Sequence, residues 1–240
     1  MVIKHSMETE EEKKPKSMEA EAVPEKKEES PQQAATTTTV ITPSGSSRPR
    51  ETFIVLDFMH HGSRLDKRPI HLKERVAQVL SKELLVLLEF IPTPDYSPKL
   101  GDVVFNDDKT KIAKVVGRVP LSRLTNVARA ELSAVLEDVV SGDDARFIDF
   151  FNKSQPLTMR QHSLELLPGI GKKHMWTIIE ARKIKPFESF NDLRERIKLL
   201  SDPRKAVVKR IIAELDEQEK YYVFVKPPSL MRERDRDKSW

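Results

Sequence analysis

The stretch Leu164–Glu180, with the sequence LELLPGIGKKHMWTIIE, decides the fold of the C-terminal half of this chain. Pro168 ends one helix, because it offers no N–H and clashes with a preceding carbonyl. Gly169 and Gly171 tolerate positive φ and carry no Cβ, so a phosphate oxygen can approach the turn closely. The helix that follows begins with unpaired N–H groups and the positive end of its dipole. The stretch therefore predicts two helices joined by a turn that can bind an anion.

The same residues match the hairpin of a helix-hairpin-helix motif, which holds the backbone of nucleic acids. An ordinary helix-turn-helix pair is the alternative, since Pro-Gly turns are common. Apolar residues on both sides of the turn and a glycine at each hairpin position favour phosphate binding. The predicted contacts are the backbone amides of three residues and the charges of the two lysines after them, namely Gly169, Ile170, Gly171, Lys172 and Lys173.

A second, degenerate copy of this unit is predicted further along the chain. The segment Leu199–Glu214 reads LLSDPRKAVVKRIIAE, beside LLPGIGKKHMWTIIEA at Leu166–Ala181. It has lost both glycines, so its backbone cannot hold a phosphate in the same way. Two such units commonly pack together, because one alone buries too little surface. Its basic side chains could contact phosphates or form a solvated helix face, and both interpretations stay open for Arg204, Lys205, Lys209 and Arg210.

The remaining C-terminal elements are predicted from apolar periodicity and capping residues. Helices are expected over residues 126–140, over a short segment capped by Asp143-Asp144, from Thr158 into the hairpin, and over 175–182, 190–200 and 204–215. The β-forming run Tyr221–Val225 predicts a strand that returns to the preceding β unit.

Residues 51–120 predict a small all-β unit. Five short runs rich in β-formers fall at 52–58, 75–80, 84–91, 101–105 and 111–119. Five strands in so short a segment are typical of an OB-like β-barrel, a fold that commonly binds single-stranded nucleic acid, although an SH3-like barrel would leave nearly the same pattern. A basic loop follows the first strand, where OB folds often contact their ligand, and supplies the candidate residues His60, His61, Arg64, Lys67 and Arg68.

The composition limits the classes of protein. The chain has 240 residues, no cysteine and a net charge of +4. The positive excess fits a polyanionic partner, and the lack of cysteine excludes disulfide scaffolds and thiol catalysis. Neither a signal peptide nor an apolar run of about 18 residues is present. We expect a soluble, cytoplasmic protein that binds no membrane, no metal and no other cofactor. Its oligomeric state stays open.

These patterns predict an α+β protein in which a five-stranded OB-like barrel precedes an all-α helix-hairpin-helix domain. The N-terminal segment is rich in Glu, Lys, Thr and Pro, a composition typical of disorder. The predicted organisation is a disordered tail (1–50), the barrel (51–120), connecting helices (121–155), the hairpin domain with its degenerate second unit (156–225) and a disordered charged tail (226–240).

No P-loop, G-x-S-x-G elbow or H-E-x-x-H helix is found. Lys173 does stand two places after the second glycine, where helix-hairpin-helix DNA glycosylases carry a Schiff-base lysine, and Asp192 follows downstream. An activated lysine needs a deep pocket, and the chain after the hairpin is too short for the usual glycosylase body. The sequence therefore predicts a protein without catalytic activity, with a lysine-dependent glycosylase or a protein-interaction scaffold as less favoured alternatives.

Several segments together resemble an archaeal family of unknown function, whose members are described as predicted nucleotide- or RNA-binding proteins. The resemblance rests on TFIVLDFMHHG, RVAQVLSKELLVLLEFIP, GDVVF, RFIDFFNKSQPLTMRQHSLELLPGIGKKHMW and PFESFNDLRERI, within residues 51–225. It implies an OB-like barrel joined to a helix-hairpin-helix domain, and no established reaction. RNA is the first expected partner, and duplex DNA is the second.

Overall fold

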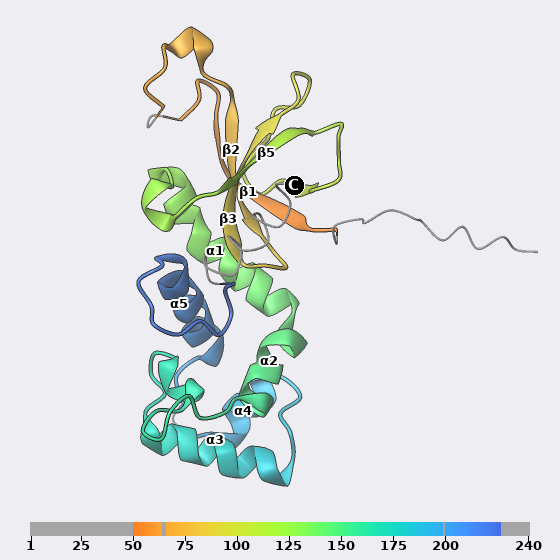
Figure 1. Ribbon diagram of the computed structural model, residues 1–240. Helices are drawn as coiled ribbons and strands as arrows, with labels where there is room; N and C mark the ends of the chain where they lie inside the picture. Colours follow the sequence, from red (N-terminus) through yellow and green to blue (C-terminus); the bar gives the residue numbers. More distant parts are fainter. Residues whose placement is uncertain (1–49, 64–65, 199, 227–240) are drawn as a thin grey trace, which may run out of the picture. The chain divides into compact units, whose positions relative to one another are not determined.

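The computed structural model describes residues 50–63, 66–198 and 200–226 (Figure 1). They all belong to one compact unit of the chain, Ser46–Trp240. The predicted tails fall outside the described residues, apart from Arg50 and Lys226, and so does Arg64 of the basic loop. The described part is α+β, with five strands followed by α-helices, as the sequence predicts, although five α-helices are present where six helices were predicted.

All five predicted strands are present, with ends that differ by a few residues. They form one antiparallel sheet in the order β4-β1-β2-β3-β5. Consecutive strands pair from β1 to β3, whereas β4 and β5 lie at opposite edges. The bounds are β1 Thr52–Met59, β2 Val76–Ser81, β3 Val86–Pro92, β4 Val103–Phe105 and β5 Ile112–Arg118.

The short connection between the two edge strands requires the sheet to curl. In a flat sheet of five strands, β4 and β5 would lie about 19 Å apart. The connection from Phe105 to Ile112 has seven Cα–Cα steps and reaches at most about 25 Å when fully extended. It is not extended, because Asp108 N–H donates to the Phe105 carbonyl at 3.0 Å and Ile112 N–H donates to the Asp108 carbonyl at 2.8 Å. The edges must therefore approach, and the sheet is a curled half-barrel. The described residues contain no β4–β5 ladder that would close it into a complete barrel.

The sheet buries both of its faces. One face gathers Phe53, Val55 and Phe90 into a small cluster of its own. The other face packs with the helices, and Leu56 and Leu80 join a core that extends to the C-terminal helices. Successive residues of a strand point to opposite faces, so Val55 and Leu56 of β1 are both buried, one in each cluster.

The C-terminal half is built from α-helices and short 3-10 helices. The bounds are α1 Asn126–Gly142, α2 Asp144–Lys153, α3 Lys172–Ile184, α4 Phe190–Arg196 and α5 Pro203–Leu215, with the 3-10 helices η1 Ile70–Leu72, η2 Leu121–Arg123 and η3 Ser163–Leu166. Thr125 caps α1 by accepting the Ala128 N–H at 3.0 Å, and its hydroxyl donates to Asp57 of β1 at 2.6 Å. This cap therefore joins α1 to the sheet. The helices α1 and α5 lie side by side (Figure 1).

The predicted helix from Thr158 is absent. Residues 158–161 form a turn, and the Pro156–His162 bridge brings the ends of this segment together. The Thr158 hydroxyl oxygen accepts the N–H groups of Arg160 and Gln161, at 3.3 and 3.1 Å. A side-chain acceptor of this kind offers the backbone an alternative to helix formation. Only η3 remains helical before the hairpin.

The predicted strand Tyr221–Val225 is also wrong. Its amides pair with no other strand, because the carboxylate of Glu214 on α5 accepts three of them. The donors are the N–H groups of Val223, Phe224 and Val225, at 2.8 to 3.0 Å. The segment still reaches the sheet, since Arg118 of β5 donates to the carbonyl of Lys226 at 2.8 Å.

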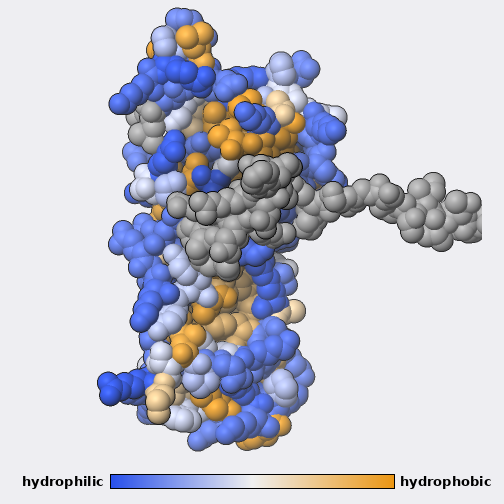
Figure 2. All heavy atoms as spheres, viewed as in Figure 1, coloured by the Kyte–Doolittle hydropathy of each residue, from blue (hydrophilic) through white to orange (hydrophobic). Residues whose placement is uncertain are grey.

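In the described part of the chain, no helix is long and apolar enough to cross a membrane. The face shown in Figure 2 is largely hydrophilic, with separate hydrophobic patches. One lies at the top, over η1, where Ile70 and Leu72 are exposed.

Candidate nucleic-acid interface

The segment predicted as the hairpin, residues 167–171, is a turn between η3 and α3. Leu167 closes η3 by donating its N–H to the Leu164 carbonyl at 3.2 Å. Gly169 has a φ of +89°, which an L-residue rarely adopts. Ile170 is buried in the core of the helices and fixes the depth of the turn. Gly171 is the residue before the first turn of α3.

The two hairpin glycines have different roles. A Cβ at Gly169 would stand 2.9 Å from the hydroxyl oxygen of Ser201, so both the backbone and its neighbour require glycine there. Gly171 has a φ of −88°, which any residue adopts, and a Cβ there would meet no atom within 4 Å. The protein's own packing therefore does not explain the second glycine, and the space beside it is open.

The first turn of α3 leaves several donors unused. No side chain caps Gly171, and the first amide of α3 with a described acceptor is that of Met175, which bonds the Gly171 carbonyl at 2.9 Å. The N–H groups of Lys172, Lys173 and His174 have no acceptor within the described residues. Both lysine side chains are exposed. This end of α3 thus combines free amides, a helix dipole and two mobile cations.

One predicted contact is wrong. The Ile170 N–H donates to the carbonyl of Leu167 at 3.1 Å, and the Ile170 side chain is buried. Its amide is therefore occupied within the hairpin and cannot hold a phosphate as well. The amides of Gly169 and Gly171 have no described acceptor and remain available.

The basic residues of the predicted second unit divide into two pairs. Lys205 and Lys209 are exposed on α5 and form no described ion pair. Arg204 is half-buried, lies over the ring of Phe190 and pairs with Asp144 at 3.1 Å.

For Arg210 the predicted phosphate contact is wrong. It is buried, and it pairs with Glu214 and Glu219, each at 2.9 Å. It also donates to the carbonyl of Tyr221. Its charge is paired with these carboxylates inside the protein, because a buried charge must be paired. It cannot reach a phosphate.

The basic loop after β1 keeps part of its predicted charge. His60, His61 and Lys67 are exposed. Arg68 instead pairs with Asp66 at 2.8 Å, and the hydrogen bond from Arg68 lowers the pKa of Asp66. Among the described residues, no hydrogen bond, ion pair or shared pocket joins this loop to the hairpin.

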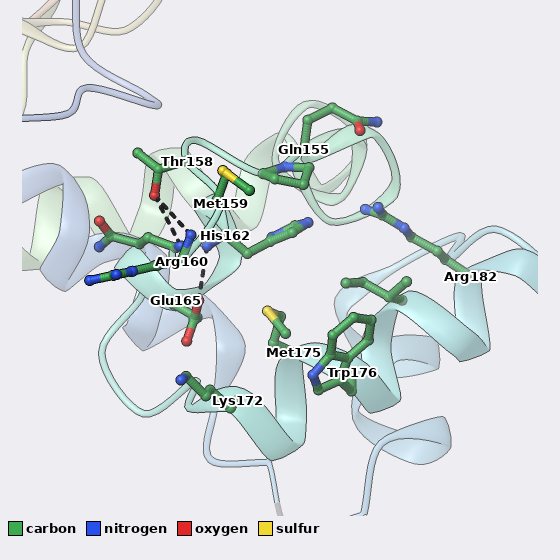
Figure 3. Close-up of a pocket in the computed structure, with 13 residues that line it drawn as sticks. Gln155, Thr158, Met159, Arg160, His162, Glu165, Lys172, Met175, Trp176 and Arg182 are labelled. Carbon is green, nitrogen blue, oxygen red and sulfur yellow. Dashed lines mark hydrogen bonds between the residues drawn. The ribbon is translucent and has the colours of Figure 1, made fainter.

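A groove beside the hairpin was not predicted from the sequence. It has a volume of about 640 Å³ and lies between the segment 155–165 and α3 (Figure 3). Lys172 belongs both to its wall and to the hairpin. Trp176 lies in the same wall, with 59% of its surface exposed. Trp176 is the signal that the sequence offered, since it stands on the outer face of α3. The segment that completes the groove was expected to be helical from Thr158 onward.

The lysine-dependent enzyme alternative gains no support from this geometry. Lys173 is exposed, whereas an activated lysine requires burial. The carboxylate of Asp192 accepts from Arg196 at 3.2 Å and from the Glu188 N–H at 3.1 Å. No described contact joins Lys173 to Asp192. Within the described ranges, no group of three His, Asp or Glu side chains is placed to hold a metal ion.

Three comparisons with known proteins agree with one another. Residues 50–226 match the model of a family described as "Protein of unknown function (DUF655)". The uncharacterised protein MJ0038 of Methanocaldococcus jannaschii is 40% identical over 176 residues, which are 72% of this chain and 78% of that protein. The crystal structure of Af1531 from Archaeoglobus fulgidus, of the same family, is 41% identical and has a TM-score of 0.66. The match covers 73% of this chain and 99% of that one. These descriptions name no ligand and no reaction.

Proposed function

The chain belongs to the DUF655 family of proteins of unknown function, which confirms the resemblance to an uncharacterised archaeal family, and we propose that it is a non-catalytic RNA-binding protein that holds the phosphate backbone at the hairpin. The proposal assigns the anion to the first turn of α3. The amides of Gly171, Lys172 and Lys173 donate to phosphate oxygens, and the two lysine side chains supply charge.

One observation carries this proposal, namely the open space at Gly171. Where a glycine is required by the fold, either φ is positive or a neighbour fills the place of the Cβ, as at Gly169. At Gly171 neither holds. A residue without a side chain at this point leaves the free amides of α3 accessible to a group as large as a phosphate.

The finer features of the fold follow the same proposal. We interpret η3, the hairpin and α3 as a helix-hairpin-helix unit whose first helix is shortened, and α4 with α5 as its degenerate partner. The contact of Ser201, between α4 and α5, with the hairpin at Gly169 supports this pairing. The curled sheet is then a half-barrel of the OB type, which would contact the RNA strand through His60, His61 and Lys67.

RNA is preferred to DNA because OB-type sheets often serve single-stranded or structured RNA, whose unstacked bases a protein can reach. Duplex DNA is the second candidate, since the hairpin alone reads only backbone. A protein-interaction scaffold is the third.

The test is a binding titration of full-length wild type, Gly171→Val and Gly171→Ser with matched single- and double-stranded RNA and DNA. A valine side chain blocks the space. A serine hydroxyl caps α3 by accepting one of its free amides, so this variant keeps its stability and loses the phosphate site. Gly142→Ser is the matched control, because a Cβ there also meets no atom within 4 Å.

We expect both Gly171 variants to bind RNA more weakly and Gly142→Ser to bind like the wild type. Stronger binding of duplex DNA, with the same dependence on Gly171, would select the DNA alternative. Equal binding by all four proteins would remove the hairpin from the interface. Binding to none of the nucleic acids would direct the search to a protein partner.

A further inference from the structure

The groove beside the hairpin has the features of a site for a flat, partly apolar ligand. Its volume of about 640 Å³ lies within the range of small-molecule sites. Figure 3 shows its two sides, the segment 155–165 and α3, with the side chains of His162, Met175 and Trp176 between them. Lys172 lines the groove and also belongs to the proposed phosphate site, so the two sites adjoin.

Large apolar side chains are left uncovered here. Met159 is fully exposed and Trp176 is 59% exposed, and both line the groove. Indole rings are normally covered or used at an interface, since burying them is strongly favourable. Met is a flexible side chain that adapts to an aromatic partner. The two residues thus offer a surface on which a planar ring can stack.

A polar donor faces the same space. His162 is only 7% exposed, and its Nδ1 accepts the Leu164 N–H at 3.1 Å. In a neutral imidazole the other nitrogen then carries the hydrogen. This Nε2–H has no described acceptor, and the ring points into the groove (Figure 3). It is available to a carbonyl or ring nitrogen of a ligand.

The rim of the groove is positive. Lys172, Arg160 and Arg182 line it, against one carboxylate, that of Glu165. Glu165 already accepts the backbone N–H of His162 at 2.9 Å. Arg182 is fixed by donating to the carbonyls of Phe151 and Ser154, each at 2.8 Å. This charge favours a ligand that is attached to an anion.

We propose that the groove holds one unpaired nucleobase of a single-stranded RNA, stacked on Trp176 and hydrogen-bonded by His162, while the phosphate of that strand occupies the hairpin. This inference rests on the proposed function and deepens it. A base in a duplex is stacked between its neighbours, so only an unpaired base can enter. Stacking tolerates every base, and each base also presents at least one ring nitrogen or carbonyl oxygen as an acceptor for the single donor of His162.

The experiment uses Trp176 as its own reporter. The chain has two tryptophans, Trp176 and Trp240, so a full-length Trp240→Phe protein reports from the groove alone. It is titrated with a single-stranded RNA of eight nucleotides and with a strand of equal length and charge that lacks its bases. We expect the RNA to quench the fluorescence and bind tightly. The baseless strand should give weaker binding and no quenching.

Two variants and a control test the stacking residue and the hydrogen-bond donor separately. Trp176→Ala should weaken RNA binding by about 5- to 150-fold, the range for one stacked base, without changing the dependence on salt. His162→Asn keeps an acceptor for the Leu164 N–H, and its shorter amide group places no donor where the Nε2–H of His162 lies. It should weaken binding by about 2- to 10-fold. Ile184→Ala removes another exposed apolar side chain of α3 that does not line the groove, and should change nothing.

The outcomes separate the two proposals. If the RNA and the baseless strand bind equally, with no quenching and with a loss in Gly171→Val, the groove inference fails and the hairpin function stands. If neither strand binds, the proposed function fails as well. Equal quenching by single-stranded DNA of the same sequence would overturn the assignment to RNA.

Discussion

Arg210 donates its Nε–H to the carboxylate of Glu214 at 2.9 Å, one turn further along α5, and both side chains are almost wholly buried. Glu214 in turn accepts the amides of Val223, Phe224 and Val225. The pair therefore fastens the chain after α5 back onto the helix. A basic residue that the sequence offers to a phosphate is used instead to complete the fold.

Replacing Arg210 should therefore lower the free energy of unfolding of the protein without changing the proposed RNA interface. Arg210→Met leaves the Glu214 carboxylate buried without its cation, and we expect a loss of about 3–5 kcal/mol in the free energy of unfolding. Urea denaturation measures this loss. Lys209→Met, at the exposed position beside it, should stay within about 0.5 kcal/mol of the wild type.

RNA binding separates the two possible roles of Arg210. At a temperature where Arg210→Met remains folded, its affinity for RNA should equal that of the wild type. A weaker affinity with unchanged stability would mean that Arg210 leaves Glu214 to bind phosphate.

The strands and the turn before α3 were predicted correctly, because both depend mainly on residues that are close together in the sequence. All five strands follow from runs of β-forming residues, and the hairpin follows from Pro168 and its glycines. The occupied amide of Ile170 was missed because the bond to Leu167 is made within the turn itself.

Long-range contacts could not be read in the same way. The burial of Arg210 depends on Tyr221 and Glu219, which fold back from beyond α5. The turn at Thr158 is made by a local bond from the Gln161 N–H to the Thr158 hydroxyl oxygen, but its position against α3, which creates the groove, is a long-range feature. These contacts leave no mark on apolar spacing or on β-propensity, which are the signals from which a helix at 158 and a strand at 221 were predicted.

The hairpin glycines should differ in their effect on stability. Gly169→Ala places a Cβ at a φ of +89° and 2.9 Å from Ser201, and we expect a loss of about 1–3 kcal/mol. Gly171→Ala meets open space at an ordinary φ and changes only the capping position, which costs less than about 1 kcal/mol. Thermal unfolding of both variants measures the difference. Equal losses would mean that the fold itself requires the second glycine.

Lys172 and Lys173 should determine the salt dependence of binding. Each phosphate contact releases counterions, so each lysine replaced by alanine should flatten the slope of log K against log salt by about 0.7–0.9. Titration of RNA from low to moderate salt measures the slope. Lys205→Ala tests whether exposed lysines of the second unit add to it. An unchanged slope in the Lys172→Ala, Lys173→Ala double variant would place the phosphate elsewhere.

His162 should make the stability of the fold depend on pH in mildly acidic solution. Burial disfavours its charged form and Arg182 repels it, so the pKa of His162 lies below its ordinary value of 6.5. Glu165 opposes this shift only in part. When the pH falls below about 6.5, the unfolded chain takes up a proton that the folded protein resists. The free energy of unfolding should therefore decrease below pH 6.5 and stop decreasing once the pH is below the folded-state pKa.

The matched variant for this effect is His162→Asn, which does not titrate and keeps an oxygen that can accept the Leu164 N–H. Urea denaturation of both proteins between pH 5 and 7.5 should give curves that diverge in the acidic range, with the wild type losing more stability. Parallel curves would mean that His162 takes up its proton as easily in the fold as in the unfolded chain.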